Sequence, residues 1–328
     1  MWLQKGDPSI PALVFLHAVW GTPIGSTIMR HLPRDRPIIS LQAPELVRDC
    51  PVSDLVGRAA AYRDLLVDEL HGHNQTIHLV GYSFSGALSF ELALCLKDSD
   101  LCCGSLCMID PVPYCSQPEN TMSHLMRRAQ CYDLFLGGML RKNAMCMMEI
   151  TSGGIACVSD LESYVLSATS KYIAKELSRM VDTMLTLSAE LFTRDFAPTR
   201  EMYSGPCAFL KAKPEFFEAV GYDSVQHPDG IYGWRHPLCS PELEAIHLDS
   251  SHIDCITHEE SVRKIAATLV SLLDETEEIE LQVAHASKPS AQTDSPQPTA
   301  CEASGSGQGQ DNTSNNLGQQ GGAGPRSD

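Results

Sequence analysis

The chain has 328 residues, of which 43% are hydrophobic, and a formal net charge of −17. So acidic a protein is poorly suited to bind nucleic acid, because the negatively charged phosphates would repel it. The thirteen cysteines lack the spacing of a metal site or a disulfide framework, so we interpret them as reduced thiols of a cytoplasmic protein without a bound metal. The sequence shows neither a secretion signal nor an apolar run of the roughly 18 residues that a membrane span needs.

Composition changes near residue 275. Residues 275–328 are rich in Ser, Gly, Gln and acidic residues, and they carry eight acids against Lys288 and Arg326, a net charge of −6. Such a segment cannot bury enough apolar surface to offset the entropy lost on folding. We therefore expect one folded domain over residues 1–274 and a disordered acidic tail over residues 275–328.

Short apolar, β-prone segments alternate with helical patterns in the first part of the chain. The expected strands lie at residues 11–17, 36–41, 76–80 and 104–109, and the main helices at residues 53–70 and 85–96. Strands that alternate with helices through right-handed crossovers form a parallel sheet that is covered on both faces. The sequence therefore predicts an α/β fold with a mostly parallel central sheet.

The alternation stops after Pro113. From about residue 122 to 196 only helical patterns appear, so we expect a helical cap insertion at about residues 115–200. Eight of the twelve methionines lie between Met122 and Met184. Flexible methionines could line an acyl channel, but we favour their filling the spaces between cap helices. Strands resume at residues 205–210 and 243–248, and a closing helix follows.

One serine stands at a sharp turn from strand to helix. Residues 76–96 read TIHLVGYSFSGALSFELALCL, with Ser83 at the apex. Such a turn crowds the positions two before and two after the apex, and Gly81 and Ser85 are both small. The pattern is the G-x-S-x-G nucleophile elbow with Ser85 in place of the last glycine, and it predicts a nucleophilic Ser83 above the helix N-terminus.

A serine nucleophile needs a base and an acid that orients the base. In this architecture the base is a histidine in the loop after the last strand, and His252 is placed there. Asp110 is a candidate acid because it ends the strand after the elbow helix, at the carboxyl edge of the sheet. Many hydrolases of this fold take the acid one strand later, which here would be one of three residues. These are Glu215, Glu218 and Asp223.

The negative oxygen that forms when a carbonyl is attacked needs backbone N–H donors. One donor would be Phe84, directly after the nucleophile, and the other Val19, in the loop after the first strand. We expect His17, at the end of that strand, to brace the loop and not to react.

These residues resemble the thioesterase domain of animal fatty acid synthases and related polyketide and peptide synthetases, a branch of the α/β-hydrolase fold. The resemblance covers roughly residues 10–274 and rests on several short segments. They are His17 to Gly21, GYSFSG at Ser83, Ile109-Asp110-Pro111, the helical insertion, and Ser251-His252 before the last helix. In that family the acid follows the strand after the elbow helix, which implies Asp110. Two residues depart from the usual pattern: Ser85 replaces a glycine and Ala18 a proline.

The resemblance implies a serine thioesterase that releases a fatty acyl group from the phosphopantetheine arm of an acyl carrier protein or from CoA. It implies no other cofactor, and it leaves open whether the domain is part of a larger fatty acid synthase. The same residues would also suit a carboxylic ester hydrolase, and a non-catalytic scaffold that binds a partner or lipid is a third reading. Reactivity toward a fluorophosphonate separates the scaffold from the two enzymes.

Overall fold

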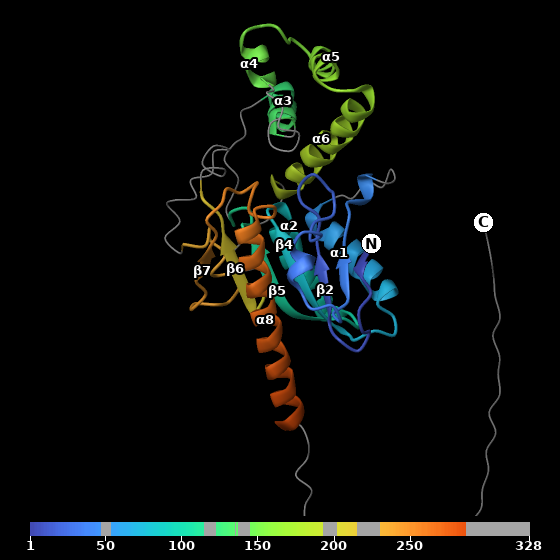
Figure 1. The fold of residues 1–328 in the computed structure, drawn as a ribbon, viewed down its shortest axis with the longest axis vertical. Coiled ribbons are helices and arrows are strands. Elements are labelled where there is room, and N and C mark those ends of the chain that lie inside the picture. Colours follow the sequence, from blue (N-terminus) through green and yellow to red (C-terminus); the bar gives the residue numbers. More distant parts are fainter. Residues whose placement is uncertain are drawn as a thin grey trace, which may run out of the picture. The chain divides into compact units, whose positions relative to one another are not determined.

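The computed structural model describes residues 1–46, 54–114, 123–134, 136, 145–192, 202–214 and 230–286. Met1–His285 forms one compact unit. Its centre is a seven-stranded sheet in the order β1-β3-β2-β4-β5-β6-β7, parallel except for β1 (Figure 1). The strands are β1 Trp2–Gln4, β2 Ala12–Phe15, β3 Ile38–Ser40, β4 Thr76–Tyr82, β5 Cys102–Ile109, β6 Cys207–Lys211 and β7 Ala245–His247. The predicted mostly parallel sheet is confirmed, and β1 is an antiparallel edge strand that the sequence did not reveal.

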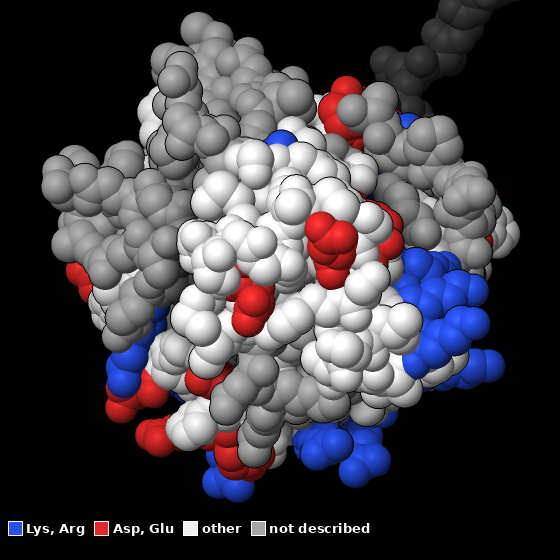
Figure 2. Space-filling model, turned by 90° about the horizontal axis from the view of Figure 1, so that it is seen from above, with Lys and Arg blue, Asp and Glu red and all other residues white. Residues whose placement is uncertain are grey.

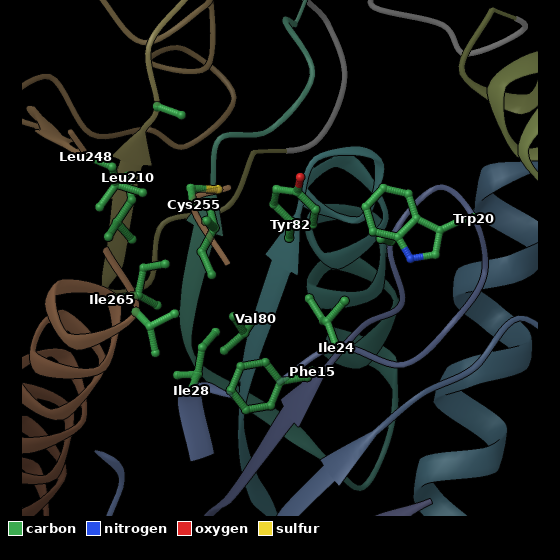
Figure 3. Close-up of a cluster of buried hydrophobic side chains, with 14 of the residues drawn as sticks. Phe15, Trp20, Ile24, Ile28, Val80, Tyr82, Leu210, Leu248, Cys255 and Ile265 are labelled. Carbon is green, nitrogen blue, oxygen red and sulfur yellow. The ribbon is translucent and has the colours of Figure 1, made fainter. Parts of the chain in front are cut away.

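Helices cover both faces of this sheet. In β2, Leu13 and Phe15 belong to the cluster packed under the closing helix α8 (Glu259–Ala286), whereas Val14 belongs to the opposite cluster. That second cluster packs against α1 (Leu55–Glu69) and α2 (Phe84–Cys95). Successive side chains of a strand point to opposite faces, so an uninterrupted apolar strand buries both. By the same alternation Val80 and Tyr82 of β4 face the α8 side (Figure 3).

The cap lies between β5 and β6 and is helical where the structure describes it. Its helices are α3 His124–Leu134, α4 Cys146–Thr151, α5 Val158–Ala168 and α6 Lys171–Phe192. The buried Arg128 of α3 forms ion pairs with Asp182 of α6 and Glu162 of α5. The carboxylate of Asp133 accepts hydrogen bonds from the first backbone N–H groups of α4. The described cap helices are thus joined to one another by charged side chains as well as by apolar packing.

The surface seen from above in Figure 2 is mostly uncharged in its described centre, with a few isolated acidic side chains, whereas Lys and Arg lie along the right and lower edges of the view. Several large apolar side chains of the cap are exposed. They are Met145, Met148, Leu166 and Tyr172. Since these residues do not face the core, the cap's apolar content is not all used for internal packing.

The last helix is longer than expected. We placed the end of the folded domain at residue 274, but α8 continues to Ala286 and the compact unit ends at His285. The extra turns contact the body of the domain, because Thr276 is buried and Glu277 forms an ion pair with the buried Arg36. The acidic composition after residue 274 hid this, since its charges can lie on the solvent side of an amphipathic helix. The rest of the expected tail lies outside the described residues.

Two further observations concern the described residues alone. No helix among them is long and apolar enough to cross a membrane. Their cysteines are all free thiols, and they contain no group of three or more His, Cys, Asp and Glu side chains that could hold a metal ion.

Candidate active site

Ser83 occupies the tight turn between β4 and α2. Its backbone has φ 57° and ψ −121°, in a region that non-glycine residues rarely adopt. The turn brings the backbone of the helix against the end of the strand, so that a Cβ atom on Gly81 would lie 2.1 Å from the carbonyl oxygen of Ser85. A glycine is therefore required two residues before Ser83, as the elbow pattern predicts.

Ser85 is the departure from that pattern, and its side chain is used within the turn. Its Oγ accepts a hydrogen bond from the N–H of Tyr82 (2.8 Å) and donates one to the carbonyl of Tyr82 (2.9 Å). Ser85 is completely buried, so these bonds are not open to water. At the next residue, Gly86, the backbone lies close to Pro111, because a Cβ atom at position 86 would lie 2.3 Å from the Cβ of Pro111.

The structure brings Ser83, His252 and Asp110 into one hydrogen-bonded chain. Nε2 of His252 lies 2.9 Å from Oγ of Ser83, and Nδ1 of His252 lies 2.6 Å from Oδ2 of Asp110. A carboxylate only accepts, so Nδ1 carries the proton and Nε2 is free to accept from the Ser83 hydroxyl. All three side chains are buried, with exposed fractions of 5%, 1% and 0% for Ser83, His252 and Asp110.

Asp110 is fixed by the neighbouring strand. It follows β5 in a left-handed conformation with φ 41°. Its backbone N–H donates to the carbonyl of Leu210 (2.7 Å), and its Oδ1 accepts from the N–H of Ala212 (3.0 Å). The carboxylate is thus held by one bond on each oxygen and cannot turn away from His252. The rival candidates Glu215, Glu218 and Asp223 lie outside the described residues.

His252 stands in the loop between β7 and α8. The loop is tied to the segment just after β6 by a bond from Lys213 N–H to the carbonyl of Ser250 (3.0 Å), and to α8 by a bond from the Ser261 hydroxyl to the Ser250 hydroxyl (2.8 Å). The hydroxyl of Tyr82 donates to the carbonyl of His252 itself (2.7 Å). The histidine loop is therefore bonded to β4, to α8 and to the segment after β6.

Two contacts of this site escaped the sequence analysis. Tyr82 touches a residue 170 positions later in the chain, and Ala212 contributes only a backbone N–H. The place of Tyr82 next to Ser83 marks it as close to the site, but no spacing rule says that its side chain reaches His252. A backbone donor such as Ala212 carries no signal in the sequence at all.

The two expected oxyanion donors lie on the elements that we predicted. Phe84 is the first residue of α2, and Val19 lies in the loop after β2. Among the described residues neither N–H donates to a backbone carbonyl. His17 packs its buried ring against Phe84, with ring centroids 5.9 Å apart, and its Nδ1 lies 2.8 Å from the carbonyl of Ala18. These contacts agree with a bracing role for His17.

Burial also sets the protonation of two neighbours. It raises the pKa of the Tyr82 phenol well above its usual value, and the nearby Cys255 and Asp110 act in the same direction. The pKa of the Cys255 thiol is likewise raised, by burial and by Asp110. At neutral pH both groups are therefore uncharged, and Tyr82 remains a hydrogen-bond donor.

Comparison with known proteins adds to this geometry. No family model matches the sequence, and no match among curated proteins was found. Among solved structures, a four-domain nonribosomal peptide synthetase bound to AMP and glycine matches over 83% of this chain with a TM-score of 0.65 and 18% identity. This chain spans only 20% of that synthetase.

Two smaller proteins match over nearly their whole length. The NocB thioesterase domain, in covalent complex with a fluorophosphonate nocardicin G analogue, has a TM-score of 0.52 at 16% identity and matches over 81% of this chain and 96% of its own. The type II thioesterase YbtT of a yersiniabactin pathway has a TM-score of 0.53 at 14% identity, over 84% and 98%. The chain has the fold of these thioesterase domains. The predicted α/β-hydrolase fold is confirmed, whereas identities this low leave the reaction and the resemblance to animal fatty acid synthase as proposals.

Proposed function

We propose that this protein is a serine thioesterase that releases an acyl group from a thioester through an acyl-enzyme on Ser83. The observation that carries the proposal is the buried chain of hydrogen bonds from Ser83 through His252 to Asp110 at a nucleophile elbow. The fold shared with thioesterase domains supports the choice of a thioester among acyl substrates.

In the first half of the reaction, Oγ of Ser83 attacks the thioester carbonyl carbon while its proton passes to Nε2 of His252. Asp110 keeps the imidazole in the right tautomer and stabilises the positive charge that it acquires. The N–H groups of Phe84 and Val19 donate to the oxygen that becomes negative. The intermediate then expels the thiolate, which takes the proton from His252.

In the second half, a water molecule attacks the acyl-enzyme. His252 accepts the proton of that water and returns it to Oγ of Ser83 as the acyl bond breaks. The free acid leaves, and the enzyme is restored. The same three side chains therefore serve both steps, without a metal and without a cofactor of the protein's own.

The substrate class follows from the resemblance in the sequence and from the cap. We expect a fatty acyl group carried on the phosphopantetheine arm of an acyl carrier protein or of CoA. If the cap offers an apolar acyl site, each added CH₂ contributes about 0.8 kcal/mol, or roughly fourfold in kcat/KM, until the site is full. A flat profile from butyryl to palmitoyl thioesters would contradict an apolar acyl site.

Hydrolysis of a series of acyl-CoA thioesters, with matched oxygen esters beside them, tests the proposal. Labelling by a fluorophosphonate should accompany the activity, and Ser83→Ala should abolish both. Ser89→Ala is a matched control, because Ser89 is a buried serine within α2 whose hydroxyl donates to the carbonyl of Gly86. Labelling with faster cleavage of oxygen esters would indicate an ester hydrolase, and no labelling at all a non-catalytic scaffold.

A further inference from the structure

The side chain of Tyr82 makes two separate contacts with His252. Its hydroxyl donates to the backbone carbonyl of His252 (2.7 Å), and its ring is stacked on the imidazole, with centroids 5.0 Å apart and planes 26° from parallel. Tyr82 is the residue before Ser83 and is completely buried. One side chain thus connects the strand that presents the nucleophile to both the backbone and the ring of the histidine.

The ring of Tyr82 is in turn held from another direction. Trp20 packs against it edge to face, with centroids 6.0 Å apart and planes at 60°. Figure 3 shows Tyr82 at the end of β4, with Trp20 on one side and Cys255 on the other. Trp20 follows Val19, the expected oxyanion donor. The rings of Trp20, Tyr82 and His252 are therefore in successive contact. These contacts connect the loop after β2, the nucleophile elbow and the loop that carries His252.

From this geometry we infer that Tyr82 is a positioning residue that aligns His252 and favours its charged form; the inference rests on the proposed function. Both ring nitrogens of His252 are engaged at the edge of the imidazole, by Asp110 and Ser83. The flat faces remain, and Tyr82 covers one of them. The face of an aromatic ring attracts a cation, so it stabilises the imidazolium that forms while Ser83 is reacting. That selective stabilisation raises kcat and leaves KM unchanged.

The other groups around this pair do not provide the same effect. The titratable groups that influence Tyr82 are Asp110, Asp254 and Cys255. Asp110 binds the edge of the imidazole, the thiol of Cys255 donates to the backbone carbonyl of His252 (3.1 Å), and Asp254 bonds to Ser251. None of these three is an aromatic ring, and the ring stacked on the imidazole is that of Tyr82.

Substitutions at Tyr82 separate the two contacts. Tyr82→Phe removes the hydroxyl and keeps the ring, so we expect kcat to fall severalfold with the acid limb of the pH profile unchanged. Tyr82→Leu removes both, so kcat should fall by about a further tenfold, which is within the range expected of a cation–π contact. The acid limb of the pH profile of kcat should move to lower pH in Tyr82→Leu, because the imidazolium of His252 is less favoured without the ring. KM should stay the same in both variants.

A matched control is Tyr203→Phe, which removes another buried tyrosine hydroxyl bonded to a backbone carbonyl, that of Pro206 (3.3 Å). Its kcat should equal that of the wild type. A folded Tyr82→Leu enzyme with wild-type kcat and pH profile would overturn the inference. Should Tyr82→Leu not fold, pentafluorophenylalanine can be compared with phenylalanine at position 82. The fluorinated ring has nearly the same shape but reversed polarity, so a slower enzyme supports the inference and an equal rate overturns it.

The rate of labelling by a fluorophosphonate keeps this test independent of the substrate. Labelling needs an activated Ser83 but no thioester. If the wild-type protein were labelled yet cleaved no thioester, the proposed function would fail while the order wild type, Tyr82→Phe, Tyr82→Leu in labelling rate would still support the role of Tyr82. Equal labelling rates in all three proteins would overturn that role.

Discussion

A buried histidine far from the candidate active site makes the stability of this protein sensitive to mild acid. His78 of β4 is 1% exposed, and its Nδ1 lies 2.8 Å from the hydroxyl of Ser105. Among the described residues its Nε2 has no hydrogen-bond partner. Burial, with a smaller contribution from the charge of Arg36, lowers the pKa of His78 from 6.5 to about 3. The folded protein therefore keeps this imidazole neutral where the unfolded chain would protonate it.

The sign and size of the effect follow from that difference. Below pH 6.5 the unfolded state binds a proton that the folded state does not, so stability falls as pH falls. The loss amounts to about 1.4 kcal/mol per pH unit and ends near pH 3. Between pH 6.5 and 5 His78 alone should lower the free energy of unfolding by on the order of 2 kcal/mol, a large share of the stability of an ordinary domain.

Urea unfolding at pH 7, 6 and 5 measures this loss, with the fluorescence of the fully buried Trp234 among the reporters. His78→Gln is the comparison, because an amide can still bond with Ser105 but does not titrate. The other ionisable groups are common to both proteins and cancel in the difference. The gap between the two free energies of unfolding should change by about 2 kcal/mol from pH 7 to pH 5. Parallel curves would refute the reasoning and show that His78 takes up its proton within the folded protein.

Three further changes test the site and the domain boundary. Asp110→Asn should keep the fold but lower kcat by up to about 10⁴-fold, because an amide cannot balance the imidazolium; a nearly silent change would return the role of the acid to the later strand. Ser85→Gly restores the usual elbow glycine but removes two bonds to Tyr82, so the free energy of unfolding should fall by about 1–2 kcal/mol in urea titrations. An unchanged value would show that these bonds contribute nothing. Ending the chain after residue 274 should cost roughly 1–2 kcal/mol, since the buried Arg36 loses its ion pair with Glu277 and keeps only its bond to the carbonyl of Pro11 among the contacts described. Ending the chain after Ala286 should cost nothing measurable in the same titration.

The sequence by itself determined most features that depend on local pattern, although not the short edge strand β1. Neighbouring residues are enough to predict the apolar strand segments, the turn of small residues and the strand that ends in Asp-Pro. In a parallel sheet the ends of strands meet at one edge. That rule placed Ser83, Asp110 and His252 within reach of one another before any coordinates were known. It did not choose between Asp110 and the acids on the later strand, because both positions lie at the same edge.

Only the tertiary structure shows which segments that are distant in the sequence contact one another. Tyr82 reaches His252, the N–H of Ala212 fixes Asp110, and the end of α8 packs on Arg36 in spite of its acidic composition. Periodicity records which side of an element is apolar, but it does not record which partner covers that side. Hydrogen bonds from backbone groups depend only on the path of the chain, so the identity of the side chains does not predict them. These contacts arise from packing between segments that lie up to 170 positions apart in the chain, so they became visible only in the folded protein.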